Sequence, residues 1–290
     1  MKKITKAVIT AAGRGTRFLP VVKQYPKELI AILDKPQLQY LVEELVGAGV
    51  TDICIVHRHG DPTIKRYFTP DKVLHDYLKK NDKLQYLASL EYIWSKVKFK
   101  FVPQHLYLPY GNASPILAAK SFIGQDNFYY LFGDDLTIEK KPGEFLSQMA
   151  QTFMTKNADA VLAVQPVPWE EISRYGSILF DKTDTTRILD VCEKVPKEVA
   201  PSNITQLGRF LFSSQILTII KSTPIKNGEL WLADANATLA KSGKVYAQYT
   251  PTDAWMTTGD PLRWLKANIV LALANPTIGP EIKNFITKLK

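Results

Sequence analysis

The sequence predicts an α/β fold with a Rossmann-like, mainly parallel mixed sheet, helices on both faces of that sheet, and a β-rich subregion in the second half. Strand-like apolar segments alternate with helical patterns through residues 6–165. Two of the segments, 128–132 and 160–165, are continuously apolar, as strands buried on both faces are. A β-α-β-α-β-α-β order favours a parallel sheet, and ligands bind beyond the carboxyl ends of its strands.

The first half supplies most of this alternation. We expect strands at 6–10, 52–56, 97–102, 128–132 and 160–165. We expect helices over 37–48, where Gly49 ends the pattern, and over 114–121 and 143–156, with a polar, helix-rich insertion at 62–96. Three loops, 13–17, 104–111 and 133–135, then follow strand ends at one edge of the sheet.

The second half has more strand character and no linker rich in Pro, Gly or Ser. We expect strands at 176–180, 187–193, 208–212 and 244–249, and helices at 214–222, 230–241 and 261–275. One domain over residues 1–290, with a subregion after about residue 165, fits this organisation.

Composition excludes several classes of protein. The chain has 290 residues, of which 46% are hydrophobic, and it carries a formal charge of +9. The basic residues form no dense block, which argues against nucleic acid as the partner. No apolar run reaches the roughly 18 residues of a membrane span, and the basic N-terminus leads into a strand rather than a secretion signal. We therefore expect a cytoplasmic protein without a membrane or nucleic-acid partner.

Cys54 and Cys192 are the only cysteines. Two cysteines are too few for a disulfide scaffold, and no C-x-x-C spacing is present for zinc. Both lie among apolar residues, so we expect buried side chains.

The loop after the first strand, residues 11–28, is the most informative segment. Gly13 and Gly15 permit a sharp turn and close approach of the backbone to a ligand. Four basic residues accompany them: Arg14, Arg17, Lys23 and Lys27. The segment predicts a site that binds a polyphosphate. It lacks the G-K-[ST] ending of a mononucleotide loop and the third glycine of a dinucleotide fingerprint.

These motifs, A-G-x-G-T-R followed by L-P-x-x-K-x-x-P-K-E, resemble those of the sugar-nucleotide pyrophosphorylases, a nucleotidyltransferase family. Further motifs extend the resemblance nearly end to end: D-K-P and Q-Y at 34–40, Y-G at 175–176, E-K at 193–194, A-P-S-N at 200–203, G-R at 208–209 and G-E-x-x-L-x-D-A at 228–235. Together with the helical insertion they are most similar to bacterial UTP–glucose-1-phosphate uridylyltransferases.

The resemblance implies a reaction between UTP and glucose 1-phosphate that gives UDP-glucose and pyrophosphate, with Mg²⁺ as cofactor. The sugar phosphate would attack the α-phosphorus in line with the leaving pyrophosphate. It also implies a nucleotide-binding part at 1–165, a sugar-phosphate-binding part at 166–290, small-molecule substrates and a homo-oligomer.

On the nucleotide side, the resemblance implies that Gly13, Gly15 and Thr16 cradle the triphosphate. Arg17 neutralises the triphosphate, and Lys27 bridges the two reacting phosphates. Base recognition falls to backbone contacts of Ala11 and Ala12, and to Gln104 and Gly111.

On the sugar and metal side, the resemblance assigns Mg²⁺ to Asp134, with Asp135 as the alternative ligand. A turn-capping aspartate is the structural alternative. Glu193 would bind a sugar hydroxyl, Lys194 the sugar phosphate, and Gly176 would bring its backbone near the sugar. A surface ion pair is the alternative for Glu193 and Lys194.

Three departures from the family pattern leave the specificity open. The usual G-L-G-H-A of the base loop is P-Y-G-N-A at 109–113. Thr257 replaces a metal-binding aspartate; the alternatives are that Asp253 or Asp260 compensates, or that the metal relies on Asp134 and phosphates. Trp231 replaces a glutamine of the family pattern. The alternative is that its side chain is simply part of the core. The remaining alternatives are a thymidylyl- or cytidylyltransferase and a nucleotide-sugar-binding regulatory protein without catalysis.

Overall fold

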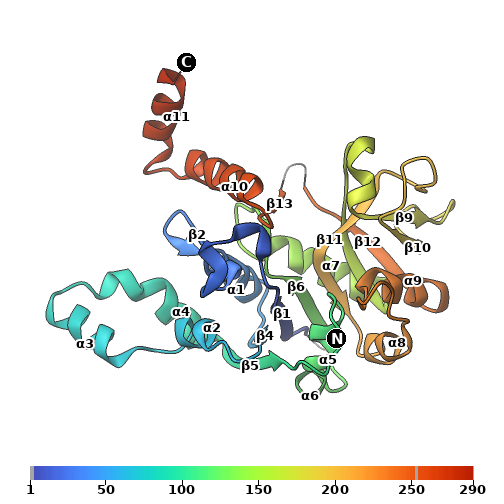
Figure 1. Ribbon diagram of the computed structural model, residues 1–290, viewed down its shortest axis with the longest axis horizontal. Coiled ribbons are helices and arrows are strands. Elements are labelled where there is room, and N and C mark those ends of the chain that lie inside the picture. The colour runs from blue at the N-terminus through green and yellow to red at the C-terminus, as the bar shows by residue number, and fades with distance from the viewer. Residues whose placement is uncertain (1–2, 252–253, 290) are drawn as a thin grey trace.

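A nine-stranded mixed sheet forms the centre of the molecule (Figure 1). The computed structural model describes residues 3–251 and 254–289. The main path of the sheet runs β10 (Ile188–Glu193), β9 (Gly176–Phe180), β11 (Ile204–Phe212), β6 (Phe128–Phe132), β1 (Lys6–Ala11), β4 (Asp52–Arg58) and β5 (Lys98–Gln104). β8 (Ala160–Pro166) pairs with β11 and with β12 (Val245–Tyr249). The predicted α/β class is confirmed.

Parallel pairing joins β6, β1, β4 and β5, in agreement with the alternation in the sequence. The next strand in the sequence departs from this expectation. β8 does not pair with β6, because β11 lies between them and is antiparallel to both. β11 is also longer than the predicted 208–212 and is buried along most of its length. Its apolar residues alternate between the two faces, which suits a central strand.

Two helical layers cover the two faces of the sheet. α1 (Gln37–Gly47) and α7 (Glu144–Thr155) pack on one face with Tyr129 and Leu131 of β6. α5 (Ser114–Ala118), α8 (Ile216–Ser222) and α9 (Leu232–Ser242) pack on the other with Phe128 and Tyr130. Successive residues of one strand thus contribute to two separate cores, which explains the continuous apolar run in β6.

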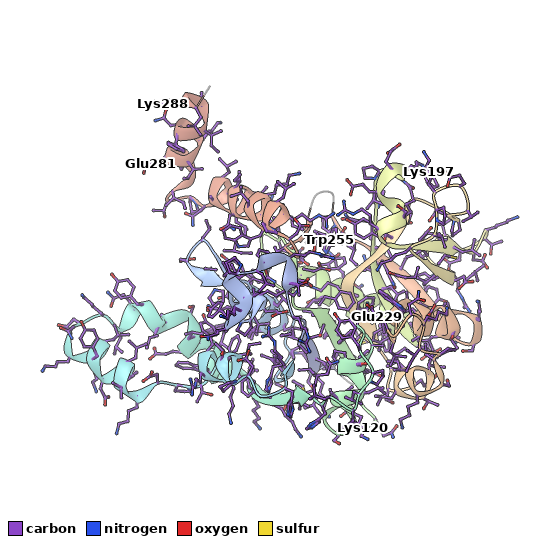
Figure 2. The ribbon with its side chains drawn as sticks, viewed as in Figure 1. Lys120, Lys197, Glu229, Trp255, Glu281 and Lys288 are labelled. Carbon is purple, nitrogen blue, oxygen red and sulfur yellow. The ribbon has the colours of Figure 1, made fainter. Side chains whose placement is uncertain are left out.

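Two helical segments extend away from the sheet (Figure 1). The predicted insertion consists of α2 (Thr63–Tyr67), α3 (Lys72–Lys80) and α4 (Ala88–Lys96). At the other extension, α10 (Pro261–Ala274) is followed by α11 (Gly279–Lys288), which was not predicted. Figure 2 shows the labelled Glu281 and Lys288 of α11 far from Glu229 and Trp255 in the body.

Smaller differences from the predictions concern one helix and one cysteine. The expected helix over 114–121 is divided at Ala119 into α5 and α6 (Lys120–Ile123). Cys54 is buried as predicted, but Cys192 is half-buried, so the prediction for it was wrong. Among the described residues, none of the helices combines the length and apolar character needed to cross a bilayer.

Two short ribbons lie outside the main sheet. β2 (Ala31–Ile32) pairs with β3 (Lys35–Pro36). β7 (Asp135–Thr137) pairs with β13 (Trp255–Thr257), and this register places Thr257 opposite Asp135. The second ribbon therefore brings a late segment of the chain to the carboxyl end of β6.

Candidate active site

Two pockets open at the carboxyl ends of the central strands and meet there. The first has a volume of about 640 Å³ and lies over β1, β4 and β5. The second has a volume of about 530 Å³ and lies over β9, β10 and β11. Both are lined by Asn112, Phe132, Asp134 and Trp231. A ligand in either pocket therefore reaches the same carboxylate.

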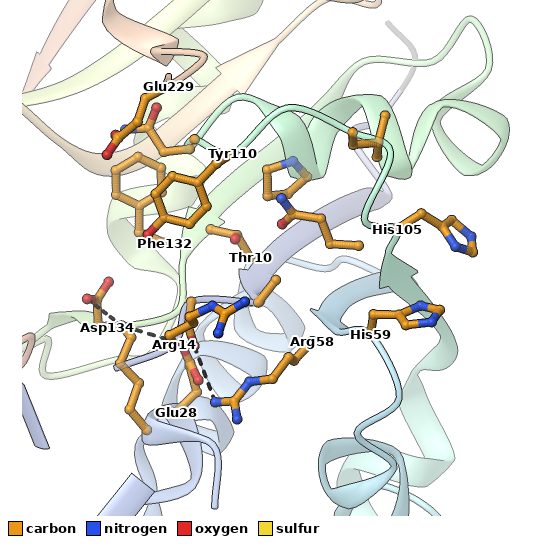
Figure 3. A pocket seen from close by; sticks show the side chains of 18 of the residues that line it. Thr10, Arg14, Glu28, Arg58, His59, His105, Tyr110, Phe132, Asp134 and Glu229 are labelled. Carbon is orange, nitrogen blue, oxygen red and sulfur yellow. Dashed lines mark hydrogen bonds and ion pairs between the residues drawn. The ribbon is translucent and has the colours of Figure 1, made fainter. Parts of the chain in front are cut away.

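The first pocket contains most of the residues predicted for the nucleotide. Ala12, Gly13, Gln104, Gly111 and Lys27 line it. Figure 3 shows Arg14 and Arg58 near Glu28, and His59 and His105 at the end away from Asp134. The expected convergence of the three loops is confirmed.

Three predicted residues of the same loop, Ala11, Gly15 and Thr16, do not line either pocket. Gly15 has another structural task. Its φ is +62°, and a Cβ there would lie 3.2 Å from Cβ and Cδ of Lys27. The absence of a side chain thus makes room for the stem of Lys27 beneath the loop.

Lys27 lies between two carboxylates. Its Nζ is 2.5 Å from Asp134 Oδ2 and 3.3 Å from Glu28 Oε1. Burial lowers the pKa of Lys27, but the charges of Asp134 and Glu28 outweigh burial, so its pKa rises above the ordinary value. Lys27 is therefore a permanent cation at the inner end of the first pocket.

Glu28 is almost fully buried, and its Oε2 has no hydrogen-bond partner among the described residues. Burial raises the pKa of Glu28, while the charge of Lys27 opposes this rise. Because Glu28 Oε1 also contacts the Lys27 ammonium, a second carboxyl group remains beside Lys27 when Asp134 binds something else.

Asp134 is fixed through its backbone by the segment after β13. Its carbonyl oxygen accepts hydrogen bonds from Thr258 N at 2.7 Å and Thr258 Oγ1 at 2.9 Å. Burial raises the pKa of its carboxyl, but the Lys27 ammonium and, to a smaller extent, Arg17 hold that pKa below its usual value. The carboxylate is thus ionised, and its backbone is held rigidly.

Arg17 lies on the other side of the junction from Lys27. It lines the second pocket rather than the first, and its Nη1 donates to Gly259 O at 3.4 Å. A Cβ on Gly259 would lie 3.1 Å from Asp134 Oδ2 and 3.6 Å from both Arg17 Nη1 and Thr257 Oγ1. Arg17, Asp134 and Thr257 therefore surround one point at the junction.

Asp135, the alternative metal ligand, has a structural role in the described contacts. It is 6% exposed, and its Oδ2 accepts a hydrogen bond from Gly208 N at 2.9 Å. Burial and the charge of Asp134 raise its pKa to about 6, against the lowering effect of Arg209. Asp134 is the better placed ligand because its carboxylate faces both pockets.

Arg209 connects β11 to α1 and to the junction. Its Nη2 donates to Glu44 Oε2 at 2.7 Å and to the Asp135 carbonyl at 3.0 Å, and its Nε donates to Glu44 Oε1 at 3.0 Å. The side chain is 1% exposed. A buried bidentate pair of this kind fixes the geometry of the segment that follows β6.

The second pocket contains all three residues predicted for the sugar phosphate, Gly176, Glu193 and Lys194. A Cβ on Gly176 would lie 2.9 Å from Glu193 Oε2, so glycine permits this close packing. Burial raises the pKa of Glu193, and Lys194 opposes the rise. Two more cations, Arg174 and Arg263, also line the pocket.

The altered base loop packs against the start of α9. Gly111 has a φ of +132°, and a Cβ there would lie 2.3 Å from Leu230 O. Leu230 N donates to Tyr110 O at 2.7 Å, and Leu232 N donates to Asn112 Oδ1 at 2.7 Å. The asparagine at 112 is therefore a cap for α9, a contact that the family comparison did not predict.

Of the two proposed substitutes for a second metal aspartate, Asp260 lines the second pocket, where its carboxylate also has partners on α10. Asp260 accepts a hydrogen bond from Arg263 N at 3.0 Å at the start of α10, and its Oδ2 is 3.3 Å from Arg263 Nη1. Asp253 lies outside the described residues. Within 3–251 and 254–289, no group of three or more His, Cys, Asp or Glu side chains is arranged to hold a metal ion.

Several pocket residues were missed by sequence reasoning: Arg58, Asn112 as a cap, Arg174 and Arg263. Arg58 had a usable signal, because it ends β4 and lies in register with Gln104 of β5. Its Nε is buried without a hydrogen-bond partner, and its side chain lines the first pocket.

Comparisons with known proteins show the family of the chain. The model of the family described as nucleotidyl transferase matches residues 6–272. The UTP–glucose-1-phosphate uridylyltransferase of Bacillus subtilis (strain 168) is 32% identical over 292 residues, which cover 100% of this chain and 98% of that protein.

Solved structures extend the similarity to the fold. A UTP-bound UGPase from Acinetobacter baumannii is 32% identical, with a TM-score of 0.89 over 99% of this chain and 100% of that one. A UDP-glucose pyrophosphorylase complexed with UDP-glucose is 31% identical, with a TM-score of 0.82 over 94% of this chain and 100% of that one. The chain belongs to the nucleotidyl transferase family.

Proposed function

We propose that this nucleotidyl transferase joins UTP and glucose 1-phosphate to give UDP-glucose and pyrophosphate. The meeting of the two pockets at Asp134 carries the proposal, because a nucleotide in one pocket and a sugar phosphate in the other would bring their phosphates together there. The names of the full-length relatives support the same substrates.

The reaction needs alignment and charge stabilisation rather than a protein nucleophile. A phosphate oxygen of glucose 1-phosphate attacks the α-phosphorus of UTP, and the bond to the β-phosphate oxygen breaks as pyrophosphate leaves. In this proposal Lys27 stabilises the negative charge at the α-phosphate from the nucleotide side. Lys194 binds the attacking phosphate, and Arg17 screens the repulsion between the two anions at the junction.

The remaining roles follow the pockets. We assign the loop from Ala11 to Thr16 to the triphosphate and the base, with Gln104 and Gly111 at the base edge. Glu193 and the backbone of Gly176 are assigned to the sugar. Residues 1–165 would then form the nucleotide-binding part and 166–290 the sugar-phosphate-binding part of one domain.

The junction fits a magnesium ion held by one protein carboxylate and by substrate phosphates. Mg²⁺ commonly binds one or two carboxylates and completes its octahedron with phosphate oxygens and water. Asp134 supplies one such carboxylate, facing both pockets. When bound, the ion would contribute charge stabilisation at the transferred phosphate. Lys27 and Arg17 already place two protein cations beside the same carboxylate.

A second candidate, a nucleotide-sugar-binding protein without catalysis, is favoured by Thr257. This residue lies opposite Asp135 in the β7–β13 ribbon and brings a hydroxyl where relatives have a carboxylate. For the enzyme, we also propose a cytoplasmic homo-oligomer that acts on small molecules.

Pyrophosphate release tests these alternatives. The protein is incubated with each of UTP, dTTP and CTP, magnesium, and a panel of sugar 1-phosphates. We expect the fastest release with UTP and glucose 1-phosphate. A preference for another base or sugar would support a sister enzyme. Binding of UDP-glucose without release from any pair would support the non-catalytic alternative.

A further inference from the structure

Trp231 occupies a position that connects both pockets. It is half-buried, lines both of them, and stands at the N-terminal boundary of α9. The family pattern has a glutamine here, so the contacts of this indole ring belong to this chain rather than to the common motif.

Lys194 lies against that ring. Its Nζ is 4.2 Å from the centroid of the Trp231 ring, well within the range of a cation–π interaction. Within the described part of the chain, Lys194 forms no ion pair with a carboxylate. The indole face is therefore the main contact that holds this exposed ammonium at the second pocket.

The backbone of Lys194 is also specified. Its φ is +48°, in the left-handed region that side-chain-bearing residues seldom adopt, and its N–H donates to Tyr175 O at 2.9 Å. The turn after β10 thus directs Lys194 toward the start of α9. Unusual backbone conformations of this kind persist where surrounding contacts fix them, and they concentrate at functional sites.

Trp231 is fixed from the other side by the base loop. Asn112 Oδ1 accepts the hydrogen bond of the Leu232 N–H at 2.7 Å, one residue after Trp231. Leu230, one residue before it, is hydrogen-bonded to Tyr110. Two departures from the family pattern, Asn112 and Trp231, therefore belong to one chain of contacts that ends at Lys194.

We propose that Trp231 is a positioning residue for Lys194: its indole face holds the ammonium where the phosphate of a sugar 1-phosphate binds. This inference rests on the proposed function, and it assigns the tryptophan to the sugar-phosphate side of the reaction. An ammonium has three N–H donors and one ring face does not engage all of them, so the cation–π contact leaves donors available for phosphate oxygens.

The test is a double-mutant cycle read by binding. Trp231→Leu removes the ring face, whereas Trp231→Phe keeps a weaker one. The Kd of glucose 1-phosphate is measured by calorimetry in the wild-type and Lys194→Met backgrounds. We expect Trp231→Leu to raise the Kd by about fivefold to thirtyfold and Trp231→Phe by less. In the Lys194→Met background the same change should have almost no further effect.

Steady-state kinetics separate positioning from general damage. Trp231→Leu should raise the KM for glucose 1-phosphate by a similar factor and change the KM for UTP less than twofold. Trp169→Leu is the matched control, because Trp169 is 45% exposed and lies outside both pockets. It should leave both KM values unchanged.

Several outcomes would overturn the inference: an equal rise in both KM values, an equal effect of Trp231→Leu with and without Lys194, or a leucine variant that binds as well as the wild type. Inorganic phosphate is a second probe for the cycle. If no nucleotide and sugar pair releases pyrophosphate, the proposed function fails. The cycle with inorganic phosphate then still decides whether Trp231 positions Lys194.

Discussion

The two pockets are built in different ways, although they meet at one carboxylate. The first pocket, which we propose for the nucleotide and call the nucleotide-side pocket, lies at the ends of the parallel strands β1, β4 and β5 and on the loops that follow each of them. The second pocket, which we propose for the sugar phosphate and call the sugar-side pocket, lies on the antiparallel strands β9, β10 and β11 and on the ribbon that β13 forms with β7. The first therefore depends on loops after parallel strands that are far apart in sequence, whereas the three strands of the second follow one another between residues 176 and 212.

The largest expected effect comes from the inner end of the nucleotide-side pocket. Lys27→Met should lower kcat by about 100-fold to 1,000-fold, because it removes the cation next to the transferred phosphate. It should also lower the free energy of unfolding by about 1–3 kcal/mol, since the buried Glu28 loses its counter-charge. Pyrophosphate release and urea denaturation measure the two effects.

Lys23→Met is the control for this change. Lys23 belongs to the same segment, but it is exposed and lines neither pocket. The Lys23→Met variant should retain near-normal turnover and stability. If Lys27→Met also kept near-normal turnover, the assignment of Lys27 to the reaction would be wrong.

The next effect concerns the contact between β11 and α1. Arg209→Met leaves the Glu44 carboxylate buried without its partner, so we expect a loss of about 3–5 kcal/mol in the free energy of unfolding. The loss would show that the sugar-side strand stabilises the nucleotide-side helix.

The exposed ion pair between Lys156 Nζ and Asp184 Oδ2, which lie 3.0 Å apart, is the control for the buried pair. Lys156→Met should cost at most about 1 kcal/mol. Denaturant unfolding measures both variants. If Arg209→Met and Lys156→Met lowered the free energy of unfolding equally, a structural role for the buried pair would be contradicted.

The smallest effect is expected where the base loop packs against α9. Gly111→Ala forces a Cβ against the Leu230 backbone, so we expect a loss of about 2–3 kcal/mol in stability and a higher KM for both substrates. Gly60 also has a positive φ, +76°, but a Cβ there would meet nothing within 4 Å, so Gly60→Ala should cost only about 1 kcal/mol. Calorimetric melting that ranked the two variants equally would show that backbone strain alone, rather than close approach, limits this loop.

Sequence reasoning succeeded where the evidence was local. The loop at 11–28 and the parallel strands follow from motifs and periodicity, and Gln104, Gly176 and Lys194 follow from the family resemblance; the structure brings these residues to the pockets. The insertion of β11 between β6 and β8 could not be predicted in this way. Strand pairing depends on contacts between segments that are far apart in sequence.

The same limit applies to single residues. The motif context of Gly15 predicts contact with phosphate, and its geometry adds a second task that the motif does not show, which is to make room for Lys27. The change to Asn112 puts base recognition in doubt, and the structure adds a second role, because Asn112 caps a helix more than a hundred residues away. Such roles depend on which backbone groups lie nearby, and residue type alone does not specify them.

The shared wall of Asn112, Phe132, Asp134 and Trp231 has a consequence for how such a protein diverges in evolution. The other described lining residues belong to one pocket or the other. If the first pocket binds the base and the second the sugar, as we propose, we expect substitutions among them to alter one preference without the other, so that the two preferences diverge separately. Laboratory selection for a new sugar should therefore recover changes among the residues private to the sugar-side pocket, while Asp134 stays constant under either selection.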